Sequence, residues 1–165
     1  MARTTAALTL SLAAGLAGAD ITDFTASISG ASEVPPAETP ATGNLTGQYD
    51  SDLNTFSFSW SITDNLIGAP ASPGAHLHMG GPDENGPIVF GFNEPDGTWA
   101  LSGSAVWSGL SAGEVDALFS GNIYVNFHTS EFPGGEVRGQ LVPAPGAVPV
   151  AGVSLLLAAR RRRAP

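Results

Sequence analysis

Short segments of alternating polar and apolar residues are the feature that most constrains the fold of this chain. The clearest is residues 55–62, Thr-Phe-Ser-Phe-Ser-Trp-Ser-Ile, in which every second side chain is apolar. This period of two is typical of a β-strand with one buried face, here formed by Phe56, Phe58, Trp60 and Ile62. Similar segments occur at residues 21–28, 44–49, 75–79, 88–92, 98–107, 123–128 and 136–142. The sequence therefore predicts about eight strands.

The connections between these segments support the same fold class. The chain contains 21 glycines and 13 prolines in 165 residues, and clusters of Gly, Pro, Asn and Asp separate the apolar segments. One short helix is expected at residues 112–119, because Ser111 and Glu114 have the spacing of a capping box and apolar residues follow at helical spacing. We therefore expect an all-β protein, an antiparallel β-sandwich of the immunoglobulin-like or superoxide-dismutase-like barrel-sandwich type.

The charges are distributed unevenly along the chain. The sequence has 15 acidic residues against six arginines, which gives a formal net charge of −9, and it has neither lysine nor cysteine. Five arginines lie at the ends, so residues 20–142 carry 15 acids against Arg138 alone, a formal charge of −14. Such a surface repels phosphate backbones, which excludes ordinary nucleic-acid binding. The lack of cysteine excludes disulfides, thiolate metal sites and a cysteine nucleophile.

The first 19 residues have the layout of a secretory signal peptide. Arg3 precedes an apolar stretch at residues 6–16, and the small residues Ala17-Gly18-Ala19 come directly before Asp20. This arrangement of a basic end, an apolar stretch and an A-x-A site predicts cleavage after Ala19. The mature chain would then begin at Asp20.

The last 23 residues form a second targeting segment. Residues 143–165 contain a Pro-rich linker, a short apolar segment at 150–159 and four consecutive arginines. This tail resembles the PEP-CTERM class of bacterial sorting signals, in the VPLPA-like variant that opens with a Val-Pro-x-Pro motif. The resemblance implies transient contact with the inner membrane, removal by a sorting protease, and release to the cell surface or extracellular matrix. A permanent short membrane anchor is the alternative. The folded domain is expected at residues 20–142.

Histidine is the most informative residue type, because the chain has only three. In a strand, His76 and His78 project from the same face, and His128 lies on the polar face of its own segment, opposite Phe127. If the two strands are neighbours, the three imidazoles form a ligand set for zinc or copper, with Glu136 or Asp83 as an accessory oxygen ligand or orienting group. The alternative is that the three histidines are surface or loop-anchoring residues whose rings bond to backbone carbonyls.

One segment matches a serine-hydrolase motif, but its context does not fit that class of enzyme. Residues 109–113 satisfy the G-x-S-x-G pattern, but the nucleophile elbow needs a strand, turn and helix within a large α/β sheet. Ser111 is better explained as the N-cap of the short helix. We therefore expect no catalytic residue.

Four motifs in order resemble the CHRD domain, the module named for its repeats in chordin. They lie at residues 29–36, at 39–43, at 75–78 with 86–89, and at 121–141. The resemblance covers nearly the whole domain and implies an extracellular β-sandwich with no catalytic residue to transfer. We therefore expect a non-enzymatic cell-surface or extracellular-matrix binding or structural module, whose partner is an extracellular protein or a matrix polymer. The alternative function is a zinc- or copper-binding domain with redox activity that uses the three histidines.

Overall fold

The computed structural model describes residues 20–146, so the expected signal peptide and all but the first four residues of the expected tail lie outside the described residues. The elements are β1 (Ile21–Ser29), a 3-10 turn η1 (Gly30–Ser32), β2 (Thr42–Asp50), β3 (Thr55–Ile62), β4 (Pro70–Met79), β5 (Ile88–Gly91), β6 (Ser102–Ser108), α1 (Ala112–Phe119), β7 (Ile123–Thr129) and β8 (Val137–Pro143). All eight expected strands and the expected helix are present. The largest differences are β4, which begins five residues earlier than predicted, and β6, which begins four residues later.

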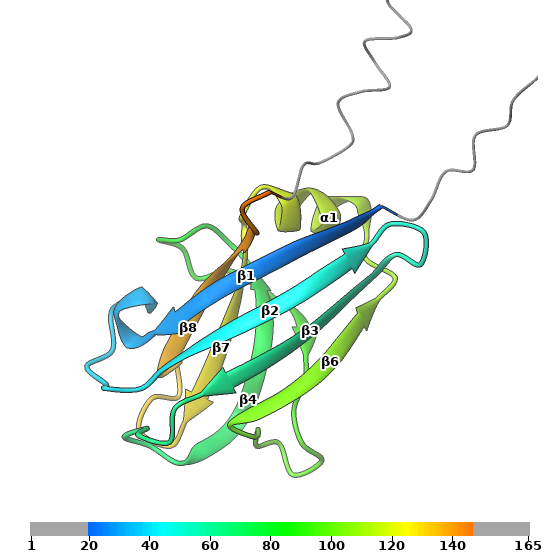
Figure 1. Ribbon diagram of the computed structural model, residues 1–165. Helices are drawn as coiled ribbons and strands as arrows, with labels where there is room; N and C mark the ends of the chain where they lie inside the picture. The colour runs from blue at the N-terminus through cyan, green and yellow to red at the C-terminus, as the bar shows by residue number, and fades with distance from the viewer. Residues whose placement is uncertain (1–19, 147–165) are drawn as a thin grey trace, which may run out of the picture.

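The strands form one antiparallel sheet that folds back on itself as a barrel-like sandwich. Their order is β5-β4-β7-β8-β1-β2-β3-β6, and Figure 1 shows β1, β2, β3 and β6 lying over β8, β7 and β4. The two halves are joined where β1 pairs with β8, with Thr25 opposite Val142. At the other edge, the rings of Phe90 in β5 and Trp107 in β6 stack with their centroids 6.0 Å apart. The all-β prediction is therefore confirmed.

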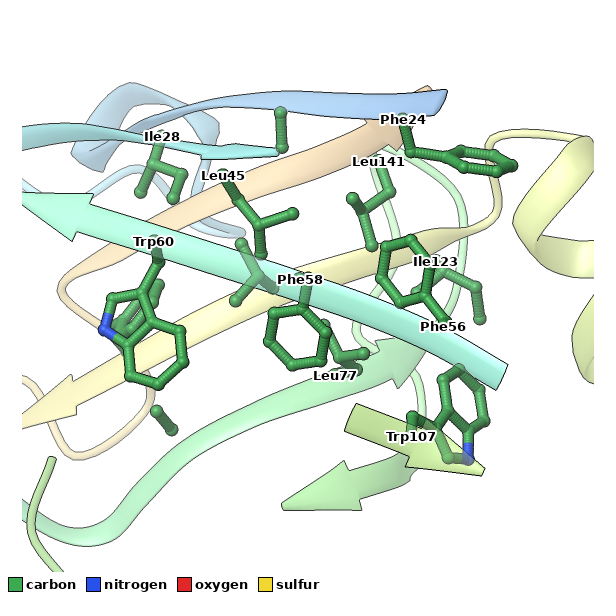
Figure 2. Close-up of a cluster of buried hydrophobic side chains, with 14 of the residues drawn as sticks. Phe24, Ile28, Leu45, Phe56, Phe58, Trp60, Leu77, Trp107, Ile123 and Leu141 are labelled. Atoms are coloured by element: carbon green, nitrogen blue, oxygen red, sulfur yellow. The ribbon is translucent and has the colours of Figure 1, made fainter. Parts of the chain in front are cut away.

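The core fills the space between the two halves of the sheet (Figure 2). All four apolar side chains of β3 that the alternation singled out are buried there. Trp60 faces Phe127 of β7 across the core, at 6.4 Å between ring centroids. Each buried aromatic or large aliphatic side chain contributes about 1.5–3 kcal/mol relative to its exposed state, so the sandwich packing carries the stability of a chain without cysteine.

The α-helix that the described residues contain, α1, closes one end of the sandwich. Ser111 caps α1 by accepting a hydrogen bond from the Glu114 backbone N–H, and the Glu114 carboxylate accepts from the Ser111 N–H, so the expected capping box is present. Phe119 at the helix end packs edge-to-face against Phe24 of β1, at 5.4 Å. Within residues 20–146, no helix has the length and apolar character needed to cross a membrane.

The outer face of β4 and β7 is covered, although it faces away from the core. Every residue of β7 is buried on both faces, as are five consecutive residues of β4 at 74–78. Three loops, residues 30–41, 80–87 and 130–136, contact this face through hydrogen bonds of Glu33 with Asn126, Gly86 with His78 and Pro133 with His128. The sequence placed the histidines on the face opposite the core, and the loops turn that face into a second, polar interior.

Candidate metal centre

The three histidines lie together beneath these loops. β4 pairs with β7 in antiparallel register, which sets His78 opposite Tyr124 and His76 opposite Asn126, with His128 two residues further along β7. One ring nitrogen from each of the three histidines lies within 4.8 Å of the other two. The ring centroids are 5.2 Å apart for His76 and His128, and 5.7 Å apart for His76 and His78. The strand adjacency on which the sequence argument depended is therefore present.

Backbone carbonyls of the covering loops orient two of the three rings. His78 Nδ1 lies 2.9 Å from the Gly86 carbonyl, and His128 Nδ1 lies 2.9 Å from the Pro133 carbonyl. Because a carbonyl oxygen only accepts, each Nδ1 donates and therefore carries the proton. The lone pair of each ring then resides on Nε2, the atom that a metal ion would bind.

The nitrogens left over from these bonds are buried and unpaired. His78 Nε2, His128 Nε2 and His76 Nδ1 have no hydrogen-bond partner among the described residues, and the same holds for Glu33 Oε1 and Asn126 Oδ1. Buried polar atoms are nearly always paired, and three unpaired ones in a single cluster need an explanation. A shared cation would satisfy all three at once.

The protonation states of the rings suit a cation. The pKa of His76 is lowered to about 4, first by burial and then by the nearby His128 and His78 rings, against an opposing effect of the Pro73 backbone, whose contact with the ring does not meet hydrogen-bond geometry. Burial also lowers the pKa of His78 and of His128, although the carbonyl bonds oppose the shift. All three rings are therefore neutral near pH 7, which is the state in which imidazole binds a metal.

His78, Tyr124 and Arg138 form a stack on the side of His78 that faces the 80–87 loop and β8. The Tyr124 ring stacks on the His78 ring, at 4.8 Å between centroids and 9° between planes. The Arg138 guanidinium lies over the Tyr124 ring, 3.4 Å from its centroid. Arg138 also donates to the Gly81 carbonyl at 2.7 Å and to the Asn85 side chain at 3.3 Å, so it holds the 80–87 loop in place.

The two accessory acids that the sequence suggested lie elsewhere. Neither Glu136 nor Asp83 belongs to the histidine cluster among the described residues. Asp83 is exposed in the 80–87 loop. Glu136 is fully buried and accepts hydrogen bonds from Thr39, Thr129 and the backbone N–H groups of residues 67 and 68. It therefore joins loops to strands, and the orienting role expected of it belongs to the carbonyls of residues 86 and 133.

Glu33 and Asn126 form a polar pair beside the cluster that no sequence motif indicated. Asn126 donates to Glu33 Oε2 at 3.3 Å and to the Gly134 carbonyl at 3.3 Å, so it ties the 30–41 loop to the loop that holds His128. Glu33 is only 5% exposed. Burial raises the pKa of its carboxyl to about 7, against the lowering effects of Arg138 and Asn126. Glu33 lies between strands, where strand periodicity carries no signal of burial.

The fold and this cluster define an all-β domain with a polar, histidine-lined interior outside its apolar core. Among protein families, the model of the CHRD domain matches residues 24–141. The chain belongs to the CHRD-domain family, which is typical of extracellular proteins and generally non-enzymatic. Comparison with curated proteins and with solved structures found no match.

Proposed function

We propose that this chain is an exported, non-enzymatic binding module whose CHRD domain holds one transition-metal ion, zinc or copper, through His76, His78 and His128. The observation that carries the proposal is the convergence of three ring nitrogens within 4.8 Å of one another. Three imidazoles are a recurring ligand set for both ions. The histidines lie outside the apolar core, so the packing of the core does not account for their convergence.

The geometry is close to what an ion requires. Metal–nitrogen bonds of about 2.0–2.1 Å place neighbouring ligand nitrogens roughly 3.3–3.5 Å apart in tetrahedral or trigonal sites. The nitrogens, at up to 4.8 Å, need to close by at most about 1.5 Å to reach that spacing. The carbonyls of Gly86 and Pro133 already select the proton positions of two rings, a role that partners of metal-bound histidines commonly play.

Metal analysis of the purified protein tests this proposal. After loading with Zn²⁺ or copper and dialysis, we expect one ion per chain in the unmodified protein and none in a His76→Ala/His128→Ala variant. Asp83→Asn is the matched control, because it removes an exposed acid from the adjoining loop and should leave the stoichiometry at one. Equal, substoichiometric metal in all three proteins would overturn the proposal.

The export part of the proposal rests on the two ends and on the family. CHRD domains are typical of extracellular proteins, and residues 20–142 carry a formal charge of −14 that suits hydrated, saline surroundings. The partner would be an extracellular protein or a matrix polymer, reached after a sorting protease removes residues 143–165 and ends the transient inner-membrane contact.

Mass spectrometry of the exported protein checks these two cleavages. We expect the N-terminus at Asp20 and a C-terminus upstream of the arginine cluster at residues 160–163. A chain that keeps Met1 or Ala2 would contradict the predicted signal peptide. One that starts at Asp20 but keeps all four terminal arginines would instead support the permanent anchor.

A further inference from the structure

We propose that the three-histidine site selects monovalent copper, Cu(I), over divalent ions. This inference rests on the metal-binding function proposed above and specifies which ion the site holds. Three properties of the described residues carry it: the charge of the ligands, the number of ligands, and the cation that lies behind one of them.

The ligand set carries no negative charge. The cluster contains three imidazoles and no carboxylate among the described residues, and the chain has no cysteine. A divalent ion in this buried cluster would keep its full double charge, whereas Cu(I) would bring a single charge. The cost of transferring an ion from water into a protein interior rises with the square of the charge, so the neutral site penalises the divalent ion more.

The ligand count also favours Cu(I). Protein-bound zinc is almost always four-coordinate, and Cu(II) prefers tetragonal surroundings. Here the three unpaired ring nitrogens are buried, and no fourth ligand residue joins them among the described residues. Cu(I) has a filled d shell and forms stable three-coordinate complexes with nitrogen ligands. Three ring nitrogens therefore complete the coordination of Cu(I), whereas they leave zinc or Cu(II) with fewer ligands than it prefers.

A buried guanidinium adds to this selection. Arg138 is 1% exposed and stacks over Tyr124, which in turn stacks on His78. Its charge repels a divalent ion at the cluster about twice as strongly as a monovalent one. Glu33 and Asp83 line the same pocket as this arginine, and Asp83 is exposed, so that solvent screens its charge. Burial raises the pKa of Glu33 to about 7, so near neutral pH Glu33 compensates the arginine only in part.

Competition measurements under anaerobic conditions test the selection. Cu(I) is titrated against a chromogenic Cu(I) chelator, Zn²⁺ against a zinc indicator, and Ag⁺ serves as a monovalent ion without redox chemistry. We expect Cu(I) to bind at least 100-fold more tightly than Zn²⁺, with Ag⁺ and not Zn²⁺ displacing it. Zinc affinity equal to or above that of Cu(I) would overturn the inference and leave the metal site standing. Failure of every ion to bind would overturn the proposed function itself.

An arginine variant separates the electrostatic role from a structural one. In Arg138→Gln we expect the ratio of Cu(I) affinity to Zn²⁺ affinity to fall by about tenfold, because the repelling charge is gone. Arg138→Lys keeps the charge and should keep most of the ratio. Loop damage alone would weaken both ions alike in both variants, and an unchanged ratio in Arg138→Gln would contradict the role of the guanidinium. The wild-type competition stands even if a variant fails to fold.

Discussion

Replacing Glu136 with Gln should lower the free energy of unfolding by about 3 kcal/mol, a large share of the 5–15 kcal/mol typical of a domain. The carboxylate is fully buried, and its oxygens accept from the Thr39 hydroxyl at 2.6 Å, the Thr129 hydroxyl at 2.7 Å and the Ile67 N–H at 2.7 Å. The Gly68 N–H donates as well, at 3.1 Å. A glutamine keeps the shape but turns an N–H₂ group toward donors that then lose their acceptor.

Denaturant unfolding of the full chain measures this effect, with Glu131→Gln as the matched control. Glu131 is an exposed acid in the same loop, so its variant should unfold within about 0.5 kcal/mol of the unmodified protein. Equal midpoints for the two variants would contradict the role assigned to Glu136.

The same carboxylate predicts a pH dependence. Burial by itself raises the pKa of Glu136, but the bonds from Thr39, Thr129 and the two backbone N–H groups outweigh it and lower the pKa below its usual 4.5. The unfolded chain therefore binds more protons than the folded chain in this range, and stability falls with falling pH. The contribution is fully present above about pH 4.5 and is lost as the pH falls through the folded value. The difference in unfolding free energy between the unmodified protein and Glu136→Gln should narrow as the pH falls below about 4.5. A difference that stays constant with pH would contradict the lowered pKa of Glu136.

The fold was predictable from sequence because strand alternation marks the buried face of each strand without reference to its neighbours. Residues 55–62 illustrate this, since the observed β3 has the predicted bounds and the predicted buried set. The bounds of β4 were harder to predict. Its first residues contain Pro70 and Pro73, which weaken a strand signal, and the observed register shifts between Pro70 and Ala75.

The candidate site was predictable only in part, because side-chain parity is local to a strand whereas strand pairing depends on the whole fold. Side-chain parity placed His76, His78 and His128 on the faces opposite the core, whereas the pairing of β4 with β7 depends on tertiary packing. The groups that orient the rings are main-chain carbonyls, which every residue type possesses and no sequence pattern marks. Bonds from the histidines to backbone carbonyls were expected only as the alternative to a metal site, and His78 and His128 make two such bonds. Within a metal site, the orienting role was expected of Glu136 or Asp83.

Because main-chain groups orient the histidines, the site should be more sensitive to mutations that move the backbone than to mutations that change a side chain. The 80–87 loop contacts the site through the Gly86 carbonyl, which accepts from His78, and the Gly86 N–H, which donates to the Tyr124 hydroxyl at 3.1 Å. Side-chain changes that leave the loop backbone in place should matter little. Changes that move the backbone should disturb the ring of His78 and the ring stacked on it.

Gly86→Ala should therefore weaken metal binding by about 10- to 100-fold, the usual cost of removing a group that orients a metal ligand. A Cβ at residue 86 would lie 1.7 Å from the Met79 carbonyl oxygen, a backbone atom at the end of β4, so the loop must move away. We also expect a loss of roughly 2 kcal/mol in unfolding free energy. Gly81→Ala in the same loop is the control, because its Cβ would meet nothing closer than 3.7 Å and the carbonyl that accepts from Arg138 is kept. Competition titrations on both variants decide the point: equal affinities would show that the Gly86 carbonyl does not position His78.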